Sequence, residues 1–422
     1  MKLKKALLFF VNQIFFIYKV LSVLVWFFKI KNALKKSDNI LLSEGGFGHS
    51  IIDPEMLRRM YVNMKNTCIV FQTPVHNPYV GLFWNDVDVF FFKSYIRVKF
   101  LSHESYIELR YGNYKLIVKI IKALLTFYCS ARVMNYIDFS RECIKRLTFG
   151  TEADSFYRKN IVSTGFKSFY LLNLMESVPL QNPRLPKNVR ENILSHILKY
   201  CNLSVRPKLC CIYLRAKGQA TNDNTSTLRI GAELESFVPA ITYLVKEDFV
   251  VLVTGDMSIS KEYEACFNKK IISAEFLDVC PQLFSLFSHS ESDIWIGNLG
   301  GGSWMPVLRE IPMLVVDMYP YGSGLKDAWI LLKPVYDETG NLVHYSRMFN
   351  DFLFDYNLKD NWRVLHNSPE TLLVSIKEML DSLKNNHVSE TNTAYLKSFG
   401  NHLFLKYYNM KIPTVWYDLF AE

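Results

Sequence analysis

Apolar residues in the second half of the chain occur in short runs that alternate with helical patterns. The runs predict strands at residues 208–214, 249–254, 270–274, 293–296 and 313–317. Apolar positions at helical spacing between these runs predict helices near residues 232–246, 260–268 and 281–288. Short apolar strands that alternate with helices are typical of a parallel sheet with helices on both faces. We therefore predict an α/β fold with a doubly wound sheet in this half.

The first half shows the same alternation in a less regular form. Strands are predicted at residues 39–43 and 67–72, and helices near residues 54–64 and 114–128. A proline-rich segment around Pro183 is the expected linker between the two halves. This pattern predicts two Rossmann-like domains that face a cleft.

The predicted domain boundaries follow from these elements. Residues 38–190 and 191–385 are the two Rossmann-like domains, and residues 386–422 form a helical tail that packs back on the first of them. Ligands of such sheets bind beyond the carboxyl ends of the strands. Polar and glycine-rich residues that follow strands are therefore the candidates for function.

The N-terminal segment, residues 1–37, is predicted to be a membrane-anchoring helix. Residues 6–28 are almost uninterruptedly apolar, and a helix of that length reaches across a bilayer core. Lys5, Asn12 and Lys19 repeat every seven residues and share one helix face. That polar stripe favours a helix lying in the membrane surface, with a single span and a buried core helix as the alternatives.

Charge and cysteine content limit the partners. The formal net charge is +9, but the lysines of residues 1–36 supply +8 of it, so the rest of the chain is almost neutral. A nearly neutral body does not favour a nucleic-acid partner. The eight cysteines form no C-x-x-C pair or zinc spacing, which indicates free thiols in a reducing cytoplasm. Asp86 and Asp88 form an isolated D-x-D that leads into an apolar run, so we predict no metal site, no cofactor and no requirement for Mg²⁺.

The strongest local signal follows the predicted strand at residues 293–296. Asn298 leads into Gly300, Gly301, Gly302 and Ser303, where a helix is expected to begin. Consecutive glycines let a ligand approach the backbone, and a helix N-terminus offers free N–H groups, which together favour a phosphate or diphosphate. The alternative is a tight turn in which Ser303 caps the helix.

Other strands of the second half end in further candidates. Arg215 follows the first of these strands and Arg229 follows a polar loop; both suit bidentate contact with phosphate or carboxylate. Gly255 and Asp256 follow the next strand, and the Asp256 carboxylate suits a sugar hydroxyl. Surface ion pairs for the arginines and a helix cap for Asp256 are the alternatives.

In the first half, the strand at residues 39–43 runs into Glu44, Gly45, Gly46, Phe47, Gly48 and His49. A flexible loop that carries His49 and Glu44 at a cleft is suited to supply a general base for a hydroxyl nucleophile. The alternative is a glycine turn with a hydrogen-bonded histidine.

These residues resemble a family of bacterial glycosyltransferases from capsule and O-antigen gene clusters, which have the GT-B fold. The resemblance rests on Cys211–Arg215, Leu228-Arg229, Gly255-Asp256, Phe276–Asp278, Asp293–Gly297, Gly301–Ser303, Pro306, Pro312, Trp329–Pro334 and Thr339–Leu342, with Gly48-His49 in the first half. It covers about residues 38–385 and is firmest from 208 to 345. It departs from the family at the glycine-rich stretch and at Ala216-Lys217, where an acidic residue is expected.

The resemblance implies a nucleotide-sugar donor bound by the second domain and a glycan acceptor, lipid-linked in our expectation, near Gly45, Gly46, Gly48 and His49. It implies an enzyme on the cytoplasmic face of a bacterial inner membrane that acts in surface-polysaccharide synthesis. Two alternatives stay open: a sugar-nucleotide epimerase or hydrolase on the same fold, and a non-catalytic scaffold tethered to the membrane.

Overall fold

The computed structural model describes most of the second half of the chain and shorter segments of the first. The described residues are scattered positions between 21 and 36, then 38–43, 48–61, 67–71, 77–84, 88–91, 97–99, 106–108, 122–127, 132–135, 171–172, 174–215, 231–255, 259–319, 325, 327–343, 361–387 and 411–416. Contacts within the chain divide it into two compact units, Met1–Arg146 and Leu147–Glu422. The division falls before the proline-rich segment predicted to be the linker.

The second unit is built on a six-stranded sheet in the order β12-β11-β10-β7-β8-β9, and every neighbouring pair is parallel. Its strands are β7 (Lys208–Leu214), β8 (Phe249–Gly255), β9 (Ile271–Ile272), β10 (Ile294–Asn298), β11 (Met313–Met318) and β12 (Trp329–Leu332). The first six residues of β8 are all buried, because helices cover both faces of the sheet. The parallel α/β prediction is therefore confirmed for this half.

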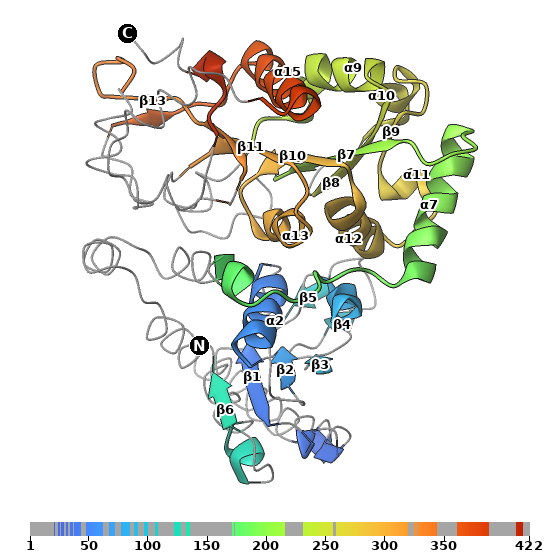
Figure 1. Ribbon diagram of the computed structural model, residues 1–422, viewed down its shortest axis with the longest axis vertical. Helices are drawn as coiled ribbons and strands as arrows, with labels where there is room; N and C mark the ends of the chain where they lie inside the picture. The colour runs from blue at the N-terminus through green and yellow to red at the C-terminus, as the bar shows by residue number, and fades with distance from the viewer. Residues whose placement is uncertain are drawn as a thin grey trace, which may run out of the picture. The chain divides into compact units, whose positions relative to one another are not determined.

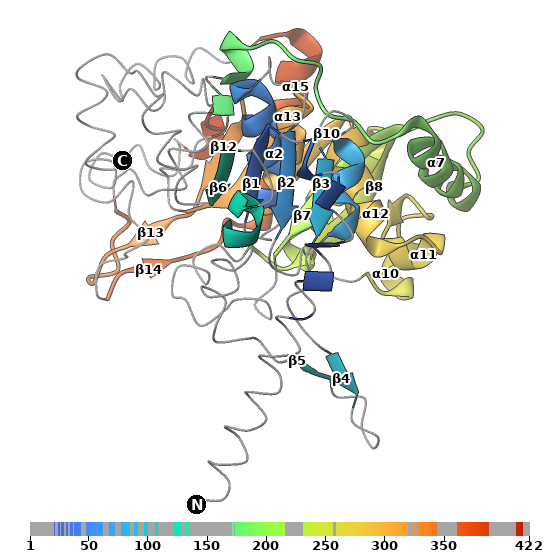
Figure 2. The ribbon, with the colours of Figure 1, turned by 90° about the horizontal axis from the view of Figure 1, so that it is seen from below.

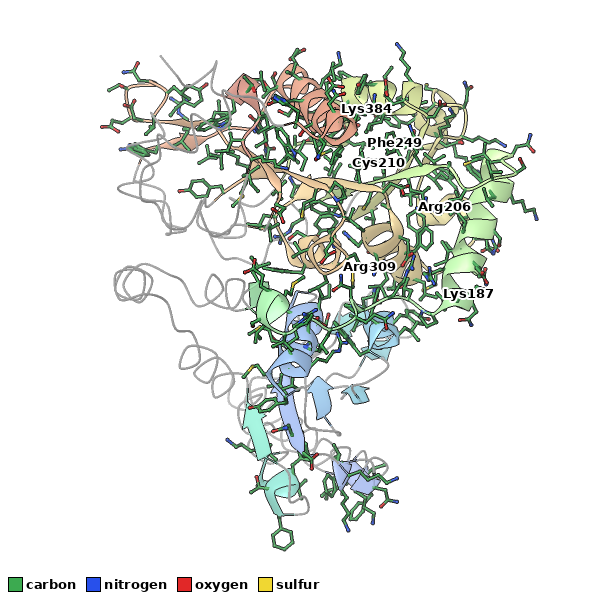
Figure 3. The ribbon with its side chains drawn as sticks, viewed as in Figure 1. Lys187, Arg206, Cys210, Phe249, Arg309 and Lys384 are labelled. Carbon is green, nitrogen blue, oxygen red and sulfur yellow. The ribbon has the colours of Figure 1, made fainter. Side chains whose placement is uncertain are left out.

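Helices form a layer on each side of this sheet. Figure 1 shows α9 (Val238–Lys246) and α15 (Pro369–Asn385) on one face, and α12 (Pro281–Glu291) and α13 (Trp304–Leu308) on the other. Ser368 caps α15 by accepting a hydrogen bond from the Thr371 N–H, and Asn386 ends the helix in the left-handed conformation. Lys384 of α15 (Figure 3) contacts the carboxylate of Glu247 at 2.7 Å, which joins the ends of α15 and α9.

The second unit contains further elements. They are α7 (Lys187–Cys201), α10 (Lys261–Ala265), α11 (Ala274–Leu277), the short 3-10 helices η3 (Leu234–Phe237) and η4 (Gly301–Ser303), and the antiparallel pair β13 (Val335–Tyr336) and β14 (Arg363–Val364). The thiols of Cys210 and Cys211 lie buried in β7, and burial raises the pKa of both. Cys266 is a free thiol that is exposed.

The strand order locates a ligand-binding edge in this unit. Numbered along the chain, the strands of the sheet follow the Rossmann order 3-2-1-4-5-6. The chain winds away in opposite directions from β7 and β10, which pair with each other. The carboxyl ends of β7 and β10 therefore form the switch point at which ligands of such sheets bind.

The first unit contains a four-stranded parallel sheet in the order β3-β2-β1-β6, which Figure 2 shows side by side. The strands are β1 (Asn39–Ser43), β2 (Thr67–Phe71), β3 (Asp88–Phe91) and β6 (Arg132–Asn135), and β4 (Arg97–Lys99) pairs with β5 (Tyr106–Glu108) separately. The 3-10 helix η1 (Pro78–Phe83) precedes β3. This strand order repeats half of the Rossmann order, so both units are Rossmann-like.

The helix that follows β1 begins earlier than its sequence predicted. α2 covers His49–Met60 and includes Pro54, whereas proline was read as the helix start. The Gly48 carbonyl accepts hydrogen bonds from the N–H groups of Ile51 and Ile52, which form the first turn before Pro54 is reached. Buried Glu55 pairs with Arg58 and Arg59, each at 2.6 Å.

The described residues near the C-terminus pack within the second unit. Lys411 forms backbone hydrogen bonds with Ala328 and Ile330 beside β12, and Thr414 donates to Glu378 of α15. Trp416 is fully buried. Lys411 therefore adds a β-bridge to the edge of the second sheet at Trp329. That the tail, residues 386–422, packs on the first domain stays a prediction, because most of the tail lies outside the described residues.

The N-terminal segment is described only in part. At described positions between 21 and 34 the chain is helical, with Phe27 and Leu34 buried and Leu21, Val25 and Phe28 exposed. No helix among the residues described here combines the length and apolarity that crossing a bilayer requires. Residues 1–20, which carry most of the predicted anchor, lie outside the described residues.

Candidate functional site at the carboxyl edge of the second sheet

Asn298 joins the ends of three strands at the switch point. Its side-chain oxygen accepts a hydrogen bond from the Arg215 N–H at 3.1 Å, and its amide donates to the Val316 carbonyl at 3.3 Å. The side chain is fully buried. Both polar ends of Asn298, which was predicted to contact the donor, form hydrogen bonds within the protein, and one of them fixes the backbone of Arg215.

The Arg215 side chain lies against the glycine-rich loop. A Cβ atom on Gly300 would come within 3.4 Å of the Arg215 Cδ and 3.5 Å of the Tyr213 hydroxyl. The predicted convergence of Arg215 and this loop is thus present in the structure. A guanidinium beside exposed backbone N–H groups can bind a phosphate through several hydrogen bonds.

The helix that begins after the loop is short. η4 at Gly301–Ser303 is followed by α13, which ends at Leu308. So short a helix carries only a small dipole, and the N-terminal charge expected here is weak. The Ser303 hydroxyl is buried and donates to the Gly300 carbonyl at 2.7 Å, so it braces the loop.

An aromatic layer supports this loop from below. The Trp295 indole N–H donates to Nδ1 of His289 at 2.8 Å, and the rings of Tyr213 and His289 meet edge-to-face at 5.0 Å. His289 is fully buried, and burial lowers the pKa of its imidazole from 6.5 to about 3. The imidazole is therefore neutral at physiological pH and acts as a packing partner for Gly302, which lies against it.

Beside the switch point, Asp317 binds two other segments of the chain. Its carboxylate accepts hydrogen bonds from the Ala232 N–H at 3.1 Å, the Asn367 N–H at 2.9 Å and the Asn367 side chain at 2.7 Å, and it contacts His366 Nδ1 at 2.7 Å. Burial by itself raises the pKa of Asp317, but the hydrogen bonds from His366 and Asn367 outweigh it, and the net pKa lies below 3.8. Asp317 is therefore ionised at neutral pH and holds these loops together.

The other predicted site residues lie at this edge, in the first unit or outside the described residues. Gly255 ends β8 with a φ of 114° and is paired with Leu214 of β7, so it lies at the same carboxyl edge as Arg215. Gly48 of the first unit precedes α2 with an ordinary helical φ of −60°. His49 is the first residue of α2, and its side chain is not among those that the structure describes. Glu44, Gly45, Gly46, Arg229 and Asp256 lie outside the described residues.

The sequence analysis did not identify Asp317, His366 or His289. Asp317 is the last residue of the apolar strand predicted at residues 313–317, a position close to the strand end that pointed to Arg215. His289 lies within an amphipathic helix pattern, where nothing distinguishes it from a surface histidine. Across the described part of the chain, no three His, Cys, Asp or Glu side chains gather as they would around a metal ion.

Comparison with known proteins gives structural likenesses only. No protein-family model matches the chain, and no curated protein sequence matches it. The E. coli ADP-heptose LPS heptosyltransferase II superposes with a TM-score of 0.44 at 9% identity over 83% of this chain and 100% of that one. A family 9 glycosyl transferase from Veillonella parvula superposes with a TM-score of 0.44 at 9% identity over 83% and 97% of the two chains.

A third likeness is to TibC, an iron-containing dodecameric glycosyltransferase from enterotoxigenic E. coli. Its TM-score is 0.36 at 12% identity, over 83% of this chain and 77% of that one. All three proteins are glycosyltransferases by name. Because the TM-scores are below 0.5, these likenesses do not establish the activity of this chain, which has to be argued from its own residues.

Proposed function

We propose that this chain is a glycosyltransferase that moves a sugar from a nucleotide-sugar donor to a glycan acceptor in the synthesis of a bacterial surface polysaccharide. The observation that carries the proposal is the position of Arg215. Its side chain lies against Gly300 at the switch point of a Rossmann-like sheet. This is where such sheets bind ligands, and the chemistry there suits a diphosphate. In this proposal the two Rossmann-like units are the acceptor and donor domains of a GT-B enzyme.

The reaction needs stabilisation of the leaving group. An acceptor hydroxyl oxygen forms a bond to the anomeric carbon while the bond from that carbon to the diphosphate breaks. The electron pair leaves with the nucleoside diphosphate, where negative charge increases. Arg215 and the N–H groups of the loop at Gly300–Gly302 are placed to stabilise that charge without a metal ion. If the reaction inverts the anomeric configuration, His49 or Glu44 accepts the acceptor proton; if it retains configuration, no such base is needed.

Binding of nucleotides by the full-length protein tests the proposal. Thermal unfolding is measured with the common nucleoside diphosphates and nucleotide sugars, with and without Mg²⁺. A ligand at about 100 times its dissociation constant stabilises the folded state by about 2.7 kcal/mol. We expect a selective shift without Mg²⁺ that Arg215→Ala abolishes. Arg206→Ala is the matched control, because Arg206 (Figure 3) precedes β7 and pairs with Asp293 at 3.1 Å.

Product analysis separates the alternatives. A transferase releases nucleoside diphosphate at a substantial rate only when an acceptor is present, whereas a hydrolase releases free sugar without one and an epimerase converts the donor. A scaffold would bind none of the nucleotides, and Arg215→Ala would leave its function intact. Absence of any nucleotide shift from a folded protein would reject the transferase proposal.

The proposal places the enzyme at a membrane surface, on the cytoplasmic face of the bacterial inner membrane. Leu21, Val25 and Phe28 are exposed and spaced to share one helix face, while Phe27 and Leu34 are buried on another. Lys31 Nζ lies 5.0 Å above the Phe28 ring, and the first 36 residues contain no acidic side chain. An apolar face beside lysines suits an anionic lipid surface and favours a helix in the plane of the membrane. A lipid-linked acceptor presents its hydroxyl at the same surface.

Sedimentation with lipid vesicles tests this location. The full-length protein is expected to sediment with vesicles that contain phosphatidylglycerol and less with phosphatidylcholine alone. Leu21→Asp combined with Phe28→Asp is expected to weaken sedimentation, because both side chains would enter the lipid charged. Val205→Asp is the control, since Val205 is equally apolar and 72% exposed in the second unit. Equal sedimentation of the two variants would contradict the proposed lipid-binding face.

A further inference from the structure

Asp317 and His366 form a carboxylate–imidazole pair at the edge of the sheet that holds Arg215. Oδ2 of Asp317 lies 2.7 Å from Nδ1 of His366. The Asp317 side chain is 1% exposed, whereas the His366 side chain is 46% exposed. One member of the pair is therefore enclosed by protein, and the other is open to a ligand.

The carboxylate determines how the imidazole can react. Asp317 is ionised and accepts hydrogen bonds, so Nδ1 of His366 carries the proton in their contact. Nε2 of His366 has no hydrogen-bond partner among the described residues. A buried carboxylate in this arrangement orients the ring and stabilises the imidazolium, which can donate a hydrogen bond from Nε2.

Sheet register places this pair next to the proposed phosphate site. Asn298 of β10 is paired with Val316 of β11, so Asp317 follows directly along the neighbouring strand. Adjacent strands are about 4.8 Å apart. Asn298 in turn accepts the hydrogen bond from the Arg215 N–H.

A single short segment connects the two sites. The Gly231 N–H donates to the Arg215 carbonyl at 3.3 Å, and the next residue, Ala232, donates its N–H to Asp317 at 3.1 Å. A Cβ atom on Gly231 would overlap the Asn298 side chain, so the segment lies directly on the ends of the strands. The adjacent residues Gly231 and Ala232 therefore bind both parts of the site: Gly231 binds the Arg215 backbone, and Ala232 binds Asp317.

We propose that His366 contacts the phosphates of the ligand bound at Arg215 and Gly300, and that Asp317 is the positioning residue that orients it. The inference rests on the proposed function and adds a second cationic contact to it. Lys333 is the charged neighbour that acts on Asp317, and it is 3% exposed, so it is enclosed with the carboxylate. His366, the exposed member of the cluster, is the one that can reach a diphosphate. Two positive groups on one diphosphate bind it more tightly than Arg215 alone.

Binding of inorganic pyrophosphate and of the common nucleoside diphosphates, measured by titration calorimetry on the full-length protein, tests this inference. His366→Gln is expected to weaken binding about tenfold, the effect of one charge-assisted hydrogen bond. His196→Gln on α7 is the matched control and should bind as the wild type does.

A double-variant cycle separates positioning from general loss of structure. Asp317→Asn is expected to weaken binding in the wild-type background and to have little further effect on binding when His366 is already Gln. Thermal unfolding of each variant without ligand shows whether it is folded. Folded His366→Gln protein that binds as tightly as the wild type, while Arg215→Ala binds weakly, would overturn the inference alone. Wild-type protein that binds none of these ligands would overturn the proposed function and this inference with it.

Discussion

Gly302 lies directly against the ring of His289. A Cβ atom on Gly302 would be 2.6 Å from Cε1 and 2.9 Å from Nε2 of the imidazole, closer than real Cβ atoms come to other heavy atoms. The imidazole is itself held by the Trp295 indole N–H. The buried rings of His289 and Trp295 therefore leave room only for glycine at position 302, and this close packing fixes the path of the loop.

The first prediction follows from this contact. Gly302→Ala should lower the free energy of unfolding by about 1–3 kcal/mol, the usual result of overpacking a buried site. Gly300→Ala is the matched control, because its Cβ would meet the flexible Arg215 Cδ at 3.4 Å, an ordinary contact. In a His289→Ala background the cost of Gly302→Ala should largely disappear, since the clashing ring is gone. Urea unfolding of the wild type, the two single variants at Gly302 and His289 and their double variant measures this coupling. Strictly additive effects of the two substitutions on the unfolding free energy would contradict it.

The second prediction concerns pH. Burial lowers the pKa of His289 from 6.5 to about 3, so the unfolded chain binds a proton that the folded protein excludes. The contribution of neutral His289 to the free energy of unfolding is therefore fully present above pH 6.5 and is lost progressively as the pH falls toward 3. Between about pH 7 and pH 5 the loss from this residue amounts to about 2 kcal/mol. His289→Gln removes the titrating group, so its unfolding free energy should fall less over that range; parallel curves for the two proteins would exclude this role.

The third prediction concerns Asn298. Replacement by Ala removes the acceptor for the Arg215 N–H and the donor to the Val316 carbonyl, both in a buried site. We expect a loss of about 1–3 kcal/mol in unfolding free energy. The ligand that binds at Arg215 should also bind more weakly, because the Arg215 backbone loses its anchor. Asn192→Ala on the exposed side of α7 is the control; a similar loss there would show that the effect is not specific to the strand ends.

The fourth prediction concerns the buried charges of α2. Glu55 is fully buried and contacts Arg58 and Arg59, each at 2.6 Å. Glu55→Leu removes the buried carboxylate that both arginines contact and should cost about 3–5 kcal/mol. The double variant Glu55→Leu with Arg59→Leu should regain part of that loss. Glu191→Ala, which breaks an exposed pair with Lys187, should leave the unfolding curve nearly unchanged. A Glu55→Leu protein as stable as the wild type would show that the pair is not needed.

The strands of the second sheet could be predicted closely from the sequence, and the reason is visible in β7 and β8. A parallel strand covered on both faces must be a continuous apolar run, and such runs stand out between polar loops. The observed bounds of β7 agree with its prediction, and those of β8 extend one residue further. β9 is reduced to Ile271–Ile272 because it is an edge strand with a single neighbour.

The helix after the glycine-rich loop was predicted less well. The sequence indicated a helix start at Gly300–Ser303, but it did not indicate that α13 would end at Leu308. The Arg309, Glu310 and Ile311 N–H groups bond back to Met305, Val307 and Pro306, which closes the helix before Pro312. A helix as short as α13 contributes little electrostatic stabilisation to this site, and Arg215 is the charged side chain that lies against the loop.

The α/β class and the succession of strands and helices in the second half could be read from the sequence, and so could the position of Arg215 and the glycine-rich loop at one edge of the sheet. These depend on periodicity and on the rule that parallel strands place their carboxyl ends at one edge. Nothing in the sequence indicated that Asp317 binds Ala232, His366 and Asn367, that His289 is buried beneath Gly302, or that Lys411 bridges to the edge of the second sheet. Such pairings join residues far apart in the chain. They are set by how loops and helices pack rather than by any local preference of the residues involved.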